Sequence, residues 1–212
     1  VLTNLLAQVK NCQQQGIQVV LVCGGGNLCR GKEMAQSGFK RTTADNIGMM
    51  ATVINSMVLR ERLTSIGCSC MLMSSFTVGS MCAQFEAYSA IKALEDGNIL
   101  ICAGGIGNPF VTTDTAAAMR GIQTEVDALL KLTNVDGLYD KDPKKYADAK
   151  LIKEASYNYC LDHQVQVMDL TSFSLCKQSA LPIHIACYKE PDVLIRVANG
   201  AKVGTKIEMN GE

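Results

Sequence analysis

Apolar residues recur at two spacings along the chain, and these spacings alternate. Apolar side chains from Leu2 to Val9 follow the three- and four-residue spacing of an amphipathic helix over residues 1–15, and Gly16 follows as its stop. Residues 17–23 then form a short β-branched run that is typical of a buried strand. The chain therefore begins with a predicted helix followed by a predicted strand.

The same alternation continues to the end of the chain. Further strands are expected at residues 69–73, 98–103, 128–133, 183–187 and 205–209. Further helices are expected at residues 45–63, 86–94, 115–123, 157–161, 171–177 and 192–198. Asp45 is placed to cap the helix 45–63, and Thr112, Thr113 and Asp114 offer cap oxygens before the helix 115–123. The pattern predicts an α/β fold, a three-layer α/β/α sandwich around a mainly parallel sheet, in a single domain over residues 1–212.

Composition narrows the classes of protein that fit this pattern. Of the 212 residues, 48% are hydrophobic and 19% are charged, which is typical of a globular chain rather than a disordered one. Lys plus Arg and Asp plus Glu number 20 each, so the chain lacks the cationic surplus that a sequence-independent nucleic-acid binder needs. Its apolar runs fall well short of the roughly 20 residues that a membrane span requires. We expect neither nucleic acid nor a membrane as partner.

The ten cysteines do not form a metal-binding or disulfide pattern. Cys68 and Cys70 are the one close pair, there is no Cys-x-x-Cys, and only His163 and His184 could complete a zinc set. We expect reduced thiols that pack as small apolar residues, no protein metal site, and a cytoplasmic location.

Two of the predicted strands run directly into glycine-rich turns. Residues 24–27 read Gly-Gly-Gly-Asn, and residues 104–109 read Gly-Gly-Ile-Gly-Asn-Pro. Glycines let the backbone approach a ligand and point several N–H groups one way, and ligands of parallel sheets bind at the carboxyl ends of the strands. Two such turns predict two phosphate cradles in one protein, one for a phosphate donor and one for an acceptor.

The first turn also approaches the P-loop pattern without completing it. Residues 26–32 fit Gly-x4-Gly-Lys, but Glu33 follows where Ser or Thr should hold magnesium. A dinucleotide site is favoured even less than a P-loop, because no complete Gly-x-Gly-x-x-Gly is present. A tight turn without a ligand remains the structural alternative for the three glycines.

Five segments in order resemble the bacterial uridylate kinase (UMP kinase) family of the amino acid kinase superfamily. The segments read VVLVCGGGNLCR at 19–30, DNIGMMA at 45–51, GNPFVTTD at 107–114, KLTNVDGLY at 131–139 and VMDL at 167–170, with Gly-Thr following at 204–205. The likeness extends over essentially the whole chain. It implies the amino acid kinase fold, which has no Walker A loop.

The resemblance also implies a reaction and its participants. The expected reaction is transfer of the γ-phosphoryl group of ATP to UMP, giving UDP and ADP in pyrimidine nucleotide synthesis, with ATP and Mg²⁺ as cofactors. It further implies a homohexamer that GTP activates and UTP inhibits. Phosphoryl transfer depends mainly on positioning and charge neutralisation, which agrees with a site built from backbone N–H groups and cations.

The resemblance assigns binding residues for both nucleotides. The residues expected to bind UMP are Gly25, Asp45, Ile106, Gly107, Asn108, Pro109, Phe110, Val111, Thr112 and Thr113. Those expected to bind ATP are Gly26, Arg30, Thr133, Tyr139 and Asp142. In this scheme Gly25 and Gly26 present their backbone to the UMP and ATP phosphates, Asp45 holds the UMP ribose, and the ATP residues beyond Arg30 hold adenosine.

Three residues are expected to be catalytic by the same resemblance. Arg30 adds positive charge near the transferred group, Asp114 supports the acceptor turn, and Asp169 orients a phosphate-binding lysine. Each assigned residue also has a structural alternative: Asp45 and Thr113 as helix caps, and Arg30 as a solvated surface charge.

Two departures from the family pattern bear on activity. The family opens with a strand carrying a Lys-x-Ser-Gly-Glu segment that is not in this sequence, so we expect either a truncated or processed chain or one in which Lys32 or Lys131 replaces the lysine of that segment. Ile106 stands where the family commonly has Thr. Two alternatives therefore stay open: a nucleotide-binding subunit without catalysis, and a sister kinase with another acceptor.

Overall fold

The structure is a computed structural model that describes residues 2–29, 34, 36–141, 143 and 145–209. The chain divides into two compact units, one formed by Gln13–Thr124 and the other by Val1–Cys12 together with Glu125–Glu212. Each unit contains a four-stranded sheet.

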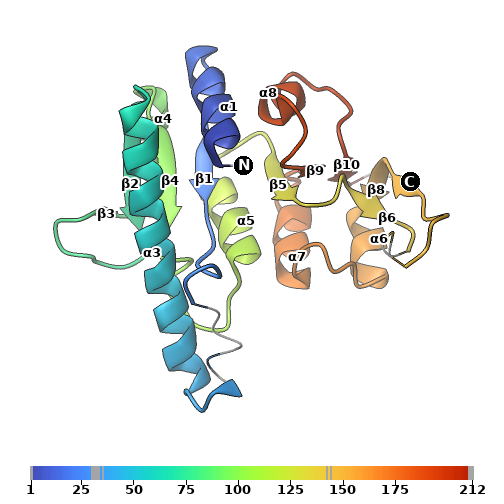
Figure 1. Ribbon diagram of the computed structural model, residues 1–212, viewed down its shortest axis with the longest axis horizontal. Coiled ribbons are helices and arrows are strands. Elements are labelled where there is room, and N and C mark those ends of the chain that lie inside the picture. The colour runs from blue at the N-terminus through green and yellow to red at the C-terminus, as the bar shows by residue number, and fades with distance from the viewer. Residues whose placement is uncertain (1, 30–33, 35, 142, 144, 210–212) are drawn as a thin grey trace. The chain divides into compact units, whose positions relative to one another are not determined.

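The sheet of the unit Gln13–Thr124 is parallel throughout. Its strands lie in the order β1 (Val20–Val22), β4 (Ile99–Ala103), β2 (Cys70–Ser74) and β3 (Ala83–Gln84). Val22 of β1 is in register with Cys102 of β4, so the two glycine turns that follow these strands leave the same edge of the sheet (Figure 1).

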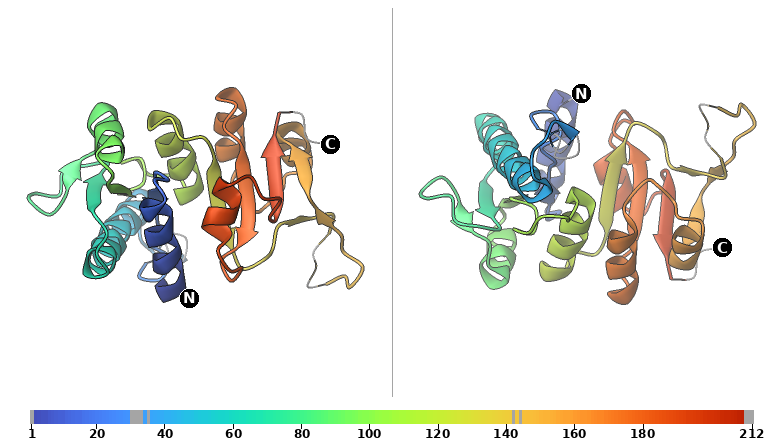
Figure 2. Two further views of the ribbon diagram at one scale, coloured as in Figure 1. Left: turned by 90° about the horizontal axis from the view of Figure 1, so that it is seen from above. Right: turned by 90° about the horizontal axis from the view of Figure 1, so that it is seen from below.

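Helices cover both faces of this sheet. Helix α3 (Arg41–Ser65) packs against β2 and β4 on one face, whereas α4 (Ala87–Glu95) and α5 (Thr113–Gln123) lie on the other, as the view from above shows (Figure 2). The buried core on the α4 side contains Leu100 and Cys102 of β4 together with three other residues, Met73, Ala90 and Leu94. Burial raises the pKa of the Cys102 thiol to about 12.

The observed helix starts explain one error of the sequence analysis. Thr112 caps α5 as expected, and its hydroxyl accepts from the N–H groups of Asp114 and Thr115 at 3.1 and 3.3 Å. Helix α3, however, begins at Arg41 after Lys40, so the prediction that Asp45 caps it is wrong. Because the helix starts one turn earlier, Asp45 lies inside it, where it pairs with Arg41 at i and i+4 and accepts a hydrogen bond from Phe110 instead of capping the helix.

The sheet of the other unit mixes parallel and antiparallel pairs. Its order is β5 (Leu129–Thr133), β9 (Ile183–Cys187), β10 (Thr205–Glu208) and β8 (Glu154–Ser156), and β9 with β10 is its antiparallel pair. A short hairpin of β6 (Leu138–Tyr139) and β7 (Leu151–Ile152) follows β5. Its helices are α6 (Tyr157–Asp162), α7 (Leu170–Gln178) and α8 (Val193–Ala198), and α1 (Leu2–Gln14) begins in this unit.

The predicted α/β class with mainly parallel pairing is confirmed. Every predicted helix and strand has an observed counterpart, and the strands that the sequence did not reveal are the short ones, β3, β6, β7 and β8. Strands of two or three residues are too short to show an alternating pattern. Within the part of the chain that the structure describes, no helix is both long and apolar enough to cross a membrane.

Gly204 and Thr205 connect the second sheet to the hairpin. The Thr205 side chain is fully buried, and its hydroxyl accepts from the N–H of Leu138 at 2.7 Å and donates to the carbonyl of Ile152 at 2.5 Å. Gly204 has φ +66°, and a methyl group there would collide with the carbonyl of Ile185 and approach that of Asp136 to 2.8 Å. Only glycine fits at this junction.

We therefore expect Gly204→Ala to lower the free energy of unfolding by about 3 kcal/mol, since both strain and overpacking act there. Gly200 is the matched control: its φ is +76°, but nothing lies within 4 Å of an added methyl group. Gly200→Ala should cost only about 1 kcal/mol, the strain of the left-handed conformation. Urea unfolding measures both values, and equal losses would contradict the packing argument.

Candidate functional site: two glycine turns on one helix

The two glycine turns lie side by side against the same segment of α3. A methyl group on Gly25 would lie 2.7 Å from the carbonyl oxygen of Gly48 and 2.8 Å from the Ala51 side chain. From the second turn, the N–H of Gly104 donates to the hydroxyl of Thr52 at 2.8 Å. The two turns are therefore neighbours, because residues 48–52 of α3 contact both of them.

The first turn is held by its own backbone and by an asparagine pair. Its N–H groups at Leu28 and Cys29 both donate to the Gly25 carbonyl at 3.0 Å. Asn55 of α3 donates to the Gly24 carbonyl at 2.7 Å and bonds to the amide of Asn27. These bonds satisfy the carbonyl oxygens of Gly24 and Gly25. The Gly24 N–H donates to no acceptor among the described residues.

The second turn depends on left-handed glycines. Gly104, Gly105 and Gly107 have φ values of +75°, +57° and +83°. Within the described part of the chain, the N–H groups of Gly105, Ile106 and Asn108 donate to no protein acceptor. A turn with several unused N–H donors is suited to bind an anion or a polar ligand.

Asp45 connects α3 to the end of the second turn. One of its carboxylate oxygens accepts the N–H of Phe110 at 2.9 Å, and Arg41 donates to the carboxylate at 2.8 Å. The Arg41 guanidinium also lies 5.5 Å from the centre of the exposed Phe110 ring. Phe110 has φ +66°, an uncommon value for a residue with a side chain, and the bond to Asp45 helps to hold it.

The start of α5 lies beside the first turn. Thr113 is its first residue, and the Thr113 hydroxyl lies 3.5 Å from the position that a methyl group on Gly24 would take. Asp114 lies in the first turn of the same helix. The unit Gln13–Thr124 thus contains every residue expected to bind UMP, in the two turns, on α3 and at the start of α5.

The residues expected to bind ATP are divided between the units. Gly26 belongs to the first turn, whereas Thr133 ends β5 and Tyr139 ends β6 in the other unit. The Tyr139 hydroxyl donates to Asp136 at 2.6 Å, a bond that raises the pKa of the phenol. Arg30 and Asp142 lie outside the described residues.

Asp169 and Lys131 have defined places in the fold. Asp169 caps α7, and its carboxylate accepts the N–H of Ser172 at 2.9 Å. Lys131 lies in β5, and Lys32 falls outside the described residues. Among the residues that the structure describes, no three potential metal ligands cluster.

A buried arginine of α5 is the main feature that the sequence did not indicate. The Arg120 side chain, in a residue only 6% exposed, donates to the Ser75 hydroxyl at 2.6 Å and approaches the Gly105 carbonyl at 3.4 Å. No motif marks a single arginine in a helix rich in small residues. The role of Arg120 depends on two contacts that form only in the folded chain. One is with Gly105, 15 residues away in the sequence, and the other is with Ser75, 45 residues away.

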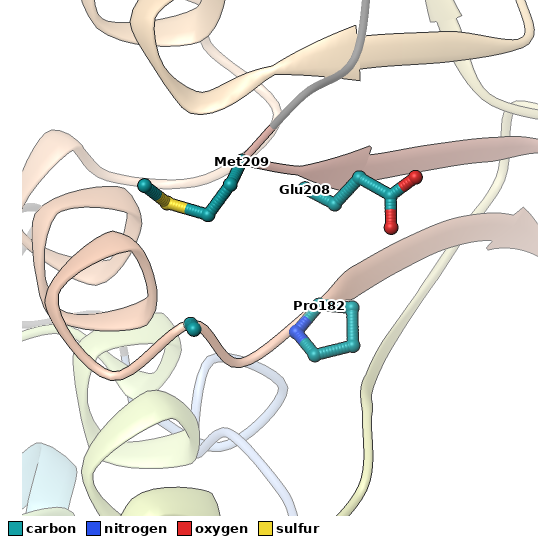
Figure 3. Close-up of a pocket in the computed structure, with 4 residues that line it drawn as sticks. Pro182, Glu208 and Met209 are labelled. Atoms are coloured by element: carbon teal, nitrogen blue, oxygen red, sulfur yellow. The ribbon is translucent and has the colours of Figure 1, made fainter.

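The pocket in Figure 3 is lined by a different set of residues. It has a volume of about 250 Å³ and lies between the end of β10, with Glu208 and Met209, and Pro182 opposite. Its lining, which also includes Ala180, contains none of the residues predicted to bind nucleotide.

Comparison with known proteins gives the class of protein to which this site belongs. The model of the amino acid kinase family matches residues 1–187, so the chain belongs to the amino acid kinase family. Within it, a uridylate kinase of Xanthomonas campestris pv. campestris is 44% identical over 98% of this chain and 87% of its own length. A uridylate kinase of Psychromonas ingrahamii is 42% identical over 98% and 84% of the two chains.

Solved structures agree with these relatives. The UMP kinase of Bacillus anthracis superposes with a TM-score of 0.94 at 36% identity, covering 98% of this chain and 86% of its own. The UMP kinase of Ureaplasma parvum has a TM-score of 0.91 at 30% identity, covering 98% and 88%. The resemblance that the sequence motifs suggested is confirmed.

The Asp45 bond to Phe110 can be tested by hydrogen exchange. We expect Asp45→Ala to speed exchange of the Phe110 amide by about tenfold, the effect of losing one charge-assisted hydrogen bond. Asp45→Asn keeps an acceptor oxygen and should retain most of the protection. NMR-detected exchange measures both variants, and an unchanged Phe110 amide in Asp45→Ala would contradict the role assigned to this carboxylate.

Proposed function

We propose that this protein transfers the γ-phosphoryl group of ATP to UMP, giving UDP and ADP. The observation that carries the proposal is the pair of glycine turns packed on residues 48–52 of α3. Among the described residues, no acceptor uses the backbone N–H groups of Gly24, Gly105, Ile106 and Asn108 in these turns. Relatives named uridylate kinase and UMP kinase support UMP as the acceptor.

The acceptor phosphate is assigned to the first turn. Gly24 lies beside Thr113, the first residue of α5, and the N-terminal end of this helix attracts negative charge. Since a side chain at position 25 would meet α3, the turn cannot retreat to make room for a bulkier residue. These features support a close approach of phosphate to backbone.

The nucleoside part of UMP is assigned to Asp45 and to the second turn. A carboxylate accepts hydrogen bonds from ribose hydroxyls, and Asp45 already has a fixed orientation through Phe110 and Arg41. The residues that would enclose the base and the phosphate of UMP are Ile106, Gly107, Asn108, Pro109, Phe110, Val111, Thr112 and Thr113. The unused N–H groups at Ile106 and Asn108 support polar contacts to the uracil ring.

The donor is assigned to Gly26, Thr133, Tyr139 and Asp142. Tyr139 has a fixed ring because its hydroxyl bonds to Asp136, which favours a role as a flat contact for adenosine. Mg²⁺ would reach the site bound mainly to ATP phosphates, as is usual for this ion, since no three potential protein ligands cluster among the described residues. When bound, it would neutralise phosphate charge.

The chemistry assigned to the protein is positioning and charge stabilisation. Arg30 would add a cation beside the transferred group, Asp114 would support the acceptor turn, and Asp169 would orient a phosphate-binding lysine. One carboxylate oxygen of Asp169 caps α7, which fixes the direction of the side chain.

Further features extend the same proposal. We place residues 1–212 in one amino acid kinase domain, since the family match runs across both units. A homohexamer, activation by GTP, inhibition by UTP, and a cytoplasmic role in pyrimidine nucleotide synthesis stay predictions. A nucleotide-binding subunit without catalysis is the alternative, and the relatives do not favour it.

The proposed reaction is tested by offering ATP, Mg²⁺ and one nucleoside monophosphate at a time, and measuring ADP release. We expect kcat/KM for UMP to exceed that for CMP, AMP and GMP by about 100-fold or more, the selectivity of a site that hydrogen-bonds its substrate.

Gly25→Ala should lower kcat/KM for UMP by a similar factor because the backbone donors of the first turn move. Gly48→Ala, with open space around its added methyl group, is the control and should stay active. Equal rates with CMP or AMP would indicate a sister kinase, and UMP binding without turnover would favour the binding subunit.

The donor assignment is tested by Tyr139→Phe. We expect KM for ATP to rise about threefold to tenfold, because the ring loses the bond to Asp136 that fixes it, while KM for UMP stays unchanged. Steady-state kinetics with each substrate varied in turn measures both constants. A rise in KM for UMP alone would contradict the assignment.

A further inference from the structure

Arg120 is a buried cation with an unusual set of partners. Its guanidinium lies 3.7 Å from the centre of the Phe85 ring, and it donates to Gln123 and to Ser75. Its Nε is buried and makes no hydrogen bond, and no carboxylate forms an ion pair with Arg120 within the described part of the chain. Burial lowers the pKa of the guanidinium.

An arginine buried without a carboxylate partner is costly to the fold. All of its acceptors are neutral: the Gln123 side chain, the Ser75 hydroxyl and, more distantly, the Gly105 carbonyl. The position therefore needs an explanation beyond stability. The explanation that we develop is its contact with the second glycine turn.

Ser75 and Arg120 together fix one peptide group of that turn. The Ser75 hydroxyl donates to the Gly105 carbonyl at 2.5 Å, and Arg120 donates to the Ser75 hydroxyl and to the same carbonyl. The Gly105–Ile106 peptide is trans, so its C=O and its N–H point in opposite directions. Because the carbonyl is held toward Ser75 and Arg120, the Ile106 N–H points to the opposite side of the turn.

This orientation matters at position 106 in particular. The isoleucine side chain offers no hydrogen bond, so the backbone N–H is the donor that this residue can present to a ligand. Gly104 and Gly105 adopt left-handed conformations that glycine reaches freely. The Gly105–Ile106 peptide would therefore rotate easily if no hydrogen bonds held its carbonyl group.

We propose that Arg120 is a positioning residue for the acceptor nucleotide: acting through Ser75 and the Gly105 carbonyl, it holds the Gly105–Ile106 peptide so that the Ile106 N–H faces the acceptor base. The identity of that base as uracil rests on the proposed function. Arg120 itself does not touch the substrate.

The test compares substitutions that break the same chain of bonds at different points. We expect Arg120→Met and Ser75→Ala each to raise KM and the calorimetric Kd for UMP about tenfold, and KM for ATP to change less than about twofold. Arg120→Lys keeps the charge but reaches fewer acceptors, so its effect should lie between wild type and Arg120→Met. The double variant should have a Kd for UMP no higher than that of the single variant with the lower UMP affinity, because both substitutions act on the same carbonyl.

Arg62→Met is the matched control, since it removes an exposed arginine of α3 in the same unit and should leave both KM values unchanged. If Arg120→Met fails to fold in urea titrations, Ser75→Ala decides. Unchanged UMP affinity in Ser75→Ala, or equal rises of KM for UMP and ATP, would overturn the inference and leave the proposed function intact. A wild-type chain that binds UMP without turnover would contradict the proposed function, while the Kd values would still test the inference.

Discussion

The close approach of the first glycine turn to α3 determines the arrangement of the rest of the site. The two backbones are so near at Gly25 and Gly48 that no side chain fits between them. This contact places α3 where Thr52 can bond to the second turn and Asp45 can reach Phe110. One helix thereby fixes two loops that lie some 80 residues apart in the sequence.

The two turns are stabilised in different ways. The first uses mainly backbone bonds and neutral amides, whereas the second is held by a carboxylate at Phe110 and by a guanidinium at Gly105. Fixed polar groups do not need to reorganise when substrate binds, so they favour a site that is shaped in advance. The shape of the second turn therefore depends on charged groups outside the turn as well as on its own glycines.

Local patterns in the sequence predicted the α/β class, the principal strands and helices, and the two turns. They did so because apolar periodicity and glycine clusters report on short segments. Asp45 shows the limit: its spacing suggests a helix cap, but the helix starts at Arg41 and the carboxylate bonds instead to Phe110, 65 residues away. Arg120 and Ser75 gave no signal, since their partnership exists only after folding. The antiparallel β9–β10 pair was also not visible, because strand direction depends on the connection rather than on the strand itself.

The buried thiol of Cys102 has a chemical consequence. It lies in β4, just before the second turn, and its pKa of about 12 keeps it protonated at neutral pH. Oxidants and alkylating reagents attack the thiolate, so this sulfur is protected from them by protonation as well as by burial. The Cys102 thiol should thus react slowly with such reagents, and the strand that supports the turn keeps this side chain unmodified.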